Sequence, residues 1–218
     1  MNRLLRTLAA AAVLLGVTLP AHAVDYGSGA AGGPVGTPVL STVPYTAVSD
    51  VMIVGDSITI RGYKDLAAAL PGKRLAVNAH SGRNTKASVD SLFASMQAGM
   101  VLPPVLIMAV GSNDVMSPFA FEAQMKRLLA GVPRGTRVFW MDIYVNRPAY
   151  PSSDLRNTDV INKRIWRYCT GNCSIISWFD FLAGYPSYRI RTHIDSGGVH
   201  QTVAGCKAWA AVIAAGIR

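Results

Sequence analysis

Short apolar runs that alternate with helical patterns are the feature of this 218-residue chain that most limits its fold. The apolar runs predict strands buried on both faces at residues 51–54, 75–79, 105–110, 138–143 and 174–178. The segments between and after them predict helices at residues 64–70, 86–98, 118–130, 154–168 and 202–215. Strict alternation of strand and helix favours a parallel sheet, because parallel strands need crossover connections that cover both faces. We therefore expect one three-layer α/β/α domain with a flavodoxin-like, doubly wound parallel sheet of five strands.

The first 23 residues have the pattern of a secretory signal peptide. Residues 1–6 are basic, residues 8–19 are apolar, and Ala21-His22-Ala23 is a small-residue cleavage pattern. A retained membrane anchor is the alternative, but the apolar stretch is shorter than the ~20 residues that span a bilayer. The residue directly after Ala23 is not a cysteine, so we expect no lipid anchor there. The pattern predicts a protein that is secreted, or periplasmic or bound in the cell envelope, after cleavage.

Residues 24–46 are rich in glycine, proline and small residues and show no hydrophobic periodicity. Such a composition is typical of a flexible leader. We therefore place the folded domain at residues 47–218.

The chain is basic, with 21 Lys and Arg against 12 Asp and Glu and a formal net charge of +9. Removal of residues 1–23 takes away two of these positive charges, Arg3 and Arg6, and leaves +7. A basic exported protein suits anionic envelope polymers or membrane surfaces as partners. No basic run is interleaved with aromatic residues, so we expect no nucleic-acid binding.

Three cysteines, Cys169, Cys173 and Cys206, lie in the last quarter of the chain. An oxidising compartment permits one disulfide with one thiol left over. We favour the pair Cys169–Cys173, because the Thr-Gly-Asn between them looks like a turn, while Cys206 stays open as a partner. Too few further ligands lie nearby for a metal site, so we expect no metal and no cofactor.

Polar residues follow the predicted strands, at the edge where doubly wound sheets bind their ligands. Gly55-Asp56-Ser57 follows the first strand, Gly82 lies just after the second, Gly111-Ser112-Asn113-Asp114 follows the third, and His200 precedes the last helix. A hydroxyl, an imidazole and hydrogen-bond donors suit acyl transfer. Each residue also has a structural interpretation: Ser57 as a helix N-cap, the glycines and Asn113 in turns, and His200 beside a helix start. Asp56 and Asp114 are expected to bond the nearby backbone.

Taken together, these motifs resemble the SGNH hydrolases, also called GDSL-like esterases and lipases, over most of residues 51–205. Gly55-Asp56-Ser57-Ile58-Thr59 and Trp178-Phe-Asp-Phe-Leu182 resemble exported bacterial members that act on cell-envelope or carbohydrate esters. The resemblance implies that Ser57 is the nucleophile and His200 the general base. It also implies an oxyanion hole formed by the Ser57 and Gly82 backbone amides and the Asn113 side chain.

The chain departs from the family pattern at the acid that orients the histidine. That acid usually lies three residues before the histidine, where this chain has Gly197, whereas Asp195 lies five before. Either the loop bends so that Asp195 completes a triad, or a backbone carbonyl orients His200 in a dyad. We name Asp195 as the third candidate catalytic residue.

The motifs of two other classes of protein are missing from the sequence. The chain has no G-x-S-x-G elbow, which argues against the α/β-hydrolase type of serine enzyme. It also has neither a G-x-x-x-x-G-K-[ST] loop nor a G-x-G-x-x-G turn after the first strand, so nucleotide binding is not expected.

We expect a secreted serine esterase that hydrolyses carboxylic esters of short acyl or acetyl groups, on small-molecule, carbohydrate or cell-envelope substrates, through an acyl-enzyme. Two alternatives stay open: an O-acyltransferase acting on an envelope polymer, and a non-catalytic binding module of the same fold.

Overall fold

The computed structural model describes residues 39–40, 49–184 and 187–218, so the predicted signal peptide and most of the predicted leader lie outside it. Its centre is a six-stranded sheet in the order β1-β3-β2-β4-β5-β6. The strands are β1 (Val39–Leu40), β2 (Val51–Gly55), β3 (Leu75–Ala79), β4 (Val105–Ala109), β5 (Arg137–Met141) and β6 (Cys173–Ile176). Strands β2 to β6 are parallel, which confirms the five predicted strands and the flavodoxin-like order. The two-residue β1, which was not predicted, adds an antiparallel edge beside β3.

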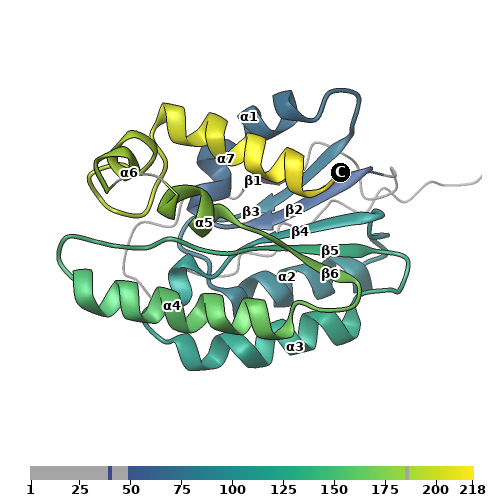
Figure 1. Ribbon diagram of the computed structural model, residues 1–218. Helices are drawn as coiled ribbons and strands as arrows, with labels where there is room; N and C mark the ends of the chain where they lie inside the picture. Colours follow the sequence, from purple (N-terminus) through teal and green to yellow (C-terminus); the bar gives the residue numbers. More distant parts are fainter. Residues whose placement is uncertain (1–38, 41–48, 185–186) are drawn as a thin grey trace, which may run out of the picture.

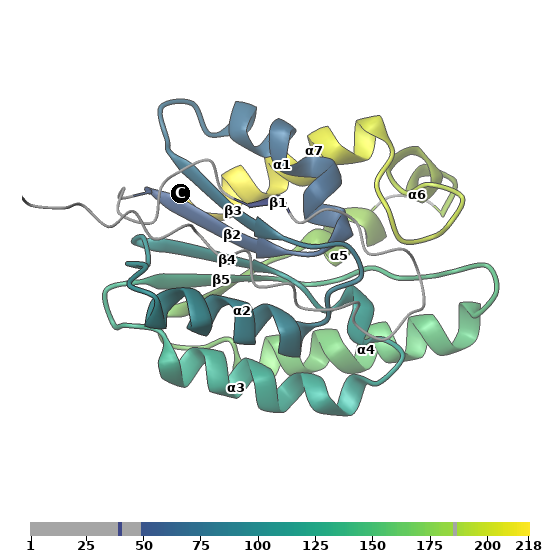
Figure 2. The ribbon, with the colours of Figure 1, turned by 180° about the vertical axis from the view of Figure 1, so that it is seen from behind.

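The helices cover both faces of this sheet, as Figures 1 and 2 show from opposite sides. Their bounds are α1 (Ser57–Ala69), α2 (Thr85–Gln97), α3 (Phe121–Gly131), α4 (Pro151–Tyr168), α5 (Trp178–Ala183), α6 (Ser187–His193) and α7 (Val203–Gly216), with short 3-10 turns η1 (Ser112–Asp114) and η2 (Pro118–Ala120). The hydrophobic core has two parts, one on each face of the sheet, because successive side chains of a strand point to opposite faces. Val54 and Met108 face α2, α3 and α4, whereas Ile53 and Ile107 face α1, α5 and α7.

Several boundaries differ from the prediction, most of all the start of α1. Helix α1 begins at Ser57 rather than at residue 64, because the Asp56 side chain caps it by accepting a hydrogen bond from the Ile58 N–H at 2.9 Å. Residue 178, predicted to end a strand, instead begins α5. Neither α5 nor α6 was predicted. No helix in the described parts of the chain is long and apolar enough to cross a membrane.

Helices α1 and α7 pack side by side on one face of the sheet (Figure 1). Their close approach needs a glycine on α1, since a Cβ added at Gly62 would lie 2.7 Å from the buried ring of Trp209. This contact fixes the start of α1, which carries Ser57, relative to the segment just before α7, which carries His200.

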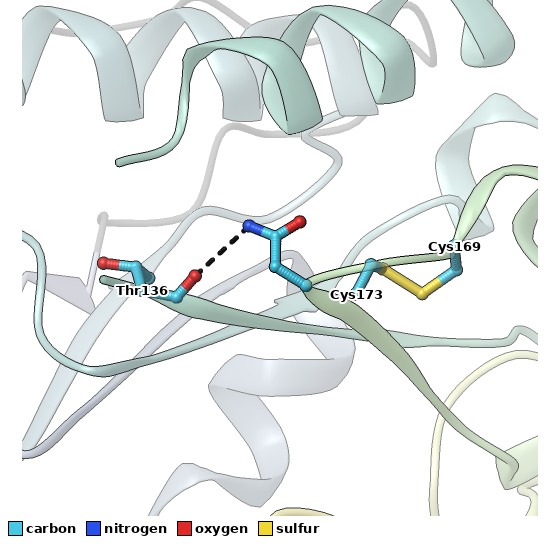
Figure 3. Close-up of a disulfide and its surroundings, with 4 residues drawn as sticks. Thr136, Cys169 and Cys173 are labelled. Carbon is cyan, nitrogen blue, oxygen red and sulfur yellow. Dashed lines mark hydrogen bonds between the residues drawn. A yellow bond between two sulfur atoms is a disulfide. The ribbon is translucent and has the colours of Figure 1, made fainter. Parts of the chain in front are cut away.

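The predicted disulfide Cys169–Cys173 is present, and Cys206 is a buried free thiol. The disulfide closes the turn between α4 and β6, where Asn172 donates a hydrogen bond to the Thr136 backbone oxygen (Figure 3). This turn lies at the amino ends of β5 and β6, away from the edge that carries Ser57.

Candidate active site

Ser57 and His200 meet although 143 positions separate them in the sequence. The Ser57 hydroxyl oxygen and His200 Nε2 are 2.9 Å apart, a hydrogen-bonding distance. Ser57 is the first residue of α1, two residues after the end of β2, and β2 lies between β3 and β4 where the strand order reverses. The pair therefore lies at the position where doubly wound sheets hold their ligands.

His200 is held in a short hairpin formed by residues 194–201, which we call the histidine hairpin. Ile194 and Gln201 form an antiparallel bridge at its base, and the Asp195 N–H donates to the His200 carbonyl at 2.8 Å. Its tip packs on the connection between β5 and α4, where the Asn146 N–H donates to the Gly198 carbonyl at 2.8 Å. The loop therefore has a defined conformation that aims the imidazole at Ser57.

The structure leaves the orienting role of Asp195 a prediction. Asp195 lies opposite His200 across the hairpin, but its carboxylate accepts hydrogen bonds from Arg61 at 3.1 Å and from the Gly197 N–H at 3.0 Å. Within the described residues, no hydrogen bond joins this carboxylate to the imidazole. Asp195 acts on the imidazole through its charge, which favours the protonated form.

The pKa of His200 is lowered from 6.5. Burial is the largest cause, because it disfavours the imidazolium ion, and the positive charge of Arg61 adds to it. The Asp195 carboxylate opposes both effects. The imidazole is therefore neutral at neutral pH, which is the form that accepts a proton.

Asp56 joins the ends of β2 and β4. Besides capping α1, it accepts hydrogen bonds from the Ser112 hydroxyl and from Asn113 Nδ2, the latter at 3.2 Å. Burial raises the pKa of this fully buried carboxyl to about 6, while its hydrogen bonds and the charge of Arg83 act in the opposite direction. The expected structural role of Asp56 at this corner is confirmed. Its neighbour Asp114 accepts from both the N–H and the hydroxyl of Thr85, at the start of α2.

Asn113 lies at the predicted edge, but both N–H groups of its side chain are occupied. Nδ2 donates to Asp56 Oδ2 and to the Arg83 carbonyl, each at 3.2 Å. These distances are at the long end of the hydrogen-bond range. A substrate oxygen would have to replace one of these acceptors, so the oxyanion role of Asn113 stays a prediction.

Gly82 lies in a turn closed by the Arg83 N–H, which donates to the His80 carbonyl at 3.4 Å. Its φ of +72° is one that residues with a Cβ rarely adopt. Within the described residues, no acceptor contacts the backbone N–H of Gly82 or of Ser57. Both predicted oxyanion donors lie after the ends of the neighbouring strands β3 and β2, and their role stays a prediction.

Two residues that support this edge were missed by the sequence interpretation. Arg83 is buried and donates to Asn78 Oδ1 at 2.7 Å and to the Gly55 carbonyl at 2.9 Å, so it ties β3 to the end of β2. Arg61, four residues after Ser57, contacts the histidine hairpin. The i, i+4 spacing of Ser57 and Arg61 on a helix was the only available signal.

A small, largely apolar cavity lies next to the residues on either side of Ser57. It is lined by Asp56, Ile58, Ala109, Val110, Ser112, Met141, Asp142, Ile143, Tyr144, Trp178 and Trp209. Burial raises the pKa of Asp142 to about 7, and this carboxyl accepts from the Phe179 N–H at 2.6 Å. Asp142 thereby joins the end of β5 to α5.

No protein-family model matches the chain, and no curated protein matches its sequence. Solved structures match it in fold. The C-terminal catalytic domain of peptidoglycan O-acetyltransferase A from Streptococcus pneumoniae aligns with a TM-score of 0.61 at 19% identity, over 78% of this chain and 94% of that one. A member of the lipolytic G-D-S-L family from Veillonella parvula aligns with a TM-score of 0.61 at 16% identity, over 74% and 93%. An acetyl xylan esterase, AlAXEase, aligns with a TM-score of 0.58 at 18% identity, over 77% and 99%.

These matches cover nearly the whole of each solved structure, and their names agree with the motifs at the ends of β2, β3 and β4 and before α7. The chain has the fold of the SGNH hydrolases.

Proposed function

We propose that the protein is an exported serine esterase that cleaves carboxylic esters through an acyl-enzyme. The main support for this proposal is the 2.9 Å contact between the Ser57 hydroxyl and His200 Nε2, at the point where the strand order of the sheet reverses. A serine nucleophile needs an adjacent base to remove its proton, and His200 is a base with a lowered pKa.

The reaction proceeds in two halves. His200 Nε2 accepts the Ser57 proton as the oxygen attacks the ester carbonyl, and His200 then donates that proton to the leaving alcohol. Water, activated by the same imidazole, releases the acid and restores Ser57. In each half, the negative oxygen is stabilised by the Ser57 and Gly82 N–H groups, with Asn113 as the third donor.

The substrate we propose is a short acyl or acetyl ester on a carbohydrate or cell-envelope polymer. Two structural neighbours support it: an acetyl xylan esterase and a peptidoglycan O-acetyltransferase domain. The excess of positive charge suits an anionic envelope polymer.

O-acyl transfer is the second candidate function, favoured by the likeness to the O-acetyltransferase domain. The acyl-enzyme is the same in both reactions, and only the acceptor differs. Incubation with p-nitrophenyl acetate and an excess of a chito-oligosaccharide separates them, because transfer yields acetylated sugar while hydrolysis yields only acetate.

The test compares wild type, Ser57→Ala and the control Ser196→Ala on p-nitrophenyl acetate. Ser196 is an exposed serine in the same hairpin as His200, so its loss removes a hydroxyl close to the site without touching the proposed chemistry. We expect turnover by wild type and Ser196→Ala and none above background by Ser57→Ala. Equal turnover by Ser57→Ala would remove Ser57 from its role, and no turnover by any of them on a broad ester panel would favour a binding module.

A further inference from the structure

Arg61 links the helix that carries Ser57 to the hairpin that carries His200. Its Nη1 donates to Asp195 Oδ2 at 3.1 Å and to the Gln201 carbonyl at 3.2 Å. One nitrogen thus contacts both strands of the histidine hairpin at its base. Because Arg61 lies four residues after Ser57 on α1, it projects from the same side of the helix as the nucleophile.

The opposite end of the hairpin is held by a different element. At the tip, the Asn146 N–H donates to the Gly198 carbonyl, and a Cβ at Gly198 would lie 2.0 Å from the Asn146 oxygen. The tip is therefore fixed to the connection between β5 and α4, whereas the base is fixed to α1 through Arg61. Through Arg61, the base of the hairpin is bound directly to the helix that presents Ser57.

The ion pair between Arg61 and Asp195 is partly exposed, with side chains 46% and 30% accessible. Pairs of this kind contribute little to the stability of a protein. A gain in folding stability is therefore a weak explanation for this contact. The better explanation is its effect on where the hairpin lies and on the charge close to the imidazole.

The described acidic, basic and histidine side chains on the elements next to the hairpin are Asp56 before α1, Arg61, Lys64 and Asp65 of α1, Asp195 of the hairpin, Asp142 and Arg147 between β5 and α4, Arg191 and His193 of α6, and Lys207 of α7. Arg147 pairs with the buried Asp154. Arg61 and Asp195 are the two charges that act on the pKa of His200, in opposite directions.

We propose that Arg61 is a positioning residue, which holds the histidine hairpin against α1 so that His200 Nε2 stays within reach of the Ser57 oxygen. The proposal rests on the esterase function proposed above. Arg61 also holds the Asp195 carboxylate in an ion pair, and its positive charge favours the neutral base.

The experiment compares Arg61→Met, Arg61→Lys and Arg74→Met with wild type. Methionine keeps the apolar stem and loses the charge, whereas lysine keeps the charge and a nitrogen that can donate to both acceptors. Arg74 is the matched control, because it forms a somewhat more exposed ion pair with Asp50, just before β3 and away from Ser57. The readouts are kcat and KM on p-nitrophenyl acetate, the pKa of His200 from an NMR titration, and hydrogen exchange of the Asp195 amide.

For Arg61→Met we expect kcat to fall about 10- to 100-fold while KM changes by less than about twofold, because a displaced base slows the chemical step. The pKa of His200 rises, and the Asp195 amide, which bonds the His200 carbonyl, exchanges faster. Arg61→Lys recovers most of kcat and keeps the wild-type pKa of His200. Arg74→Met matches wild type in every readout.

An unchanged or raised kcat in Arg61→Met would overturn the proposal, as would an equal loss in Arg74→Met. If the wild type cleaves no ester, the proposed function fails by itself. The NMR and exchange readouts need no turnover, and wild-type values of both in Arg61→Met would overturn the positioning role in that case too.

Discussion

The tip of the histidine hairpin offers a sharp test of how the site is built. Gly198 has a φ of +74°, its carbonyl accepts from the Asn146 N–H, and it lies two residues before His200. An added Cβ would lie 2.0 Å from the Asn146 oxygen and 2.6 Å from the Asn146 carbonyl carbon. Both are backbone atoms, so the clash can be relieved only by moving the hairpin or the connection between β5 and α4.

The matched control is Gly72, which also has a φ of +74° but has no atom within 4 Å of an added Cβ. Gly72→Ala should therefore cost only the left-handed backbone conformation, about 1–2 kcal/mol. Gly198→Ala should cost that amount and, in addition, about 1–3 kcal/mol for the forced displacement. The difference between the two variants isolates the close approach at the tip.

The assay is urea denaturation of both variants, followed by ester turnover. We expect Gly198→Ala to lose about 1–3 kcal/mol more unfolding free energy than Gly72→Ala. Its kcat should fall about 100-fold, since displacements of about 1 Å at a catalytic group have effects of that size. Equal losses of stability in the two variants, together with wild-type kcat in Gly198→Ala, would refute the reasoning that this contact aims His200.

Three further predictions follow from the site and the disulfide. Asn113→Ala should lower kcat about 100- to 1000-fold with little change in KM, measured by steady-state kinetics, and an effect below threefold would remove Asn113 from the oxyanion hole. Because burial and Arg61 lower the pKa of His200 and the neutral imidazole is the active base, kcat/KM should rise with pH and reach half its plateau below pH 6.5; a midpoint above that value would contradict this protonation state. Replacing Cys169 and Cys173 together by serine should lower the unfolding free energy by about 2 kcal/mol in urea denaturation, as expected for a short closed loop. Since that turn lies far from Ser57, kcat of the folded protein should not change, and a large loss would show coupling between the two ends of the sheet.

The parallel sheet was predictable because its strands are continuous apolar runs, and such runs are typical of strands covered on both faces. The start of α1 had two indications in the sequence, because the N-cap interpretation of Ser57 placed it near residue 57 and the helical pattern placed it at residue 64. Ile58-Thr59-Ile60 are β-branched residues with low helix propensity, and Gly62 is weaker still, so local sequence favoured a later start. Packing of α1 on α7 and the cap at Asp56 outweigh that preference. Strand β1 has only two residues, too few for a periodic signal.

The contact between Ser57 and His200 could be anticipated, because both lie in motifs at element boundaries and the fold places those boundaries at one edge. The ion-pair partner of Asp195 could not be anticipated. Its spacing from His200 left two geometries open, and the choice depends on Arg61, 134 positions earlier in the chain. A pattern of residue types does not encode such a pair. The role of Arg83 was missed for the same reason, because the sequence alone does not distinguish a buried arginine from an exposed one until its hydrogen-bond acceptors are known.

The most direct test of the account is covalent labelling of Ser57. Wild type, Ser57→Ala and His200→Ala are treated with phenylmethylsulfonyl fluoride, and the modified residue is located by peptide mass spectrometry. Because His200 Nε2 lies 2.9 Å from the Ser57 oxygen and activates it, wild type should carry one adduct on Ser57, while the other two proteins stay unlabelled on the same timescale. Labelling of Ser57 at the same rate in His200→Ala, or an adduct on another residue in wild type, would contradict the claim that these two side chains form the catalytic pair.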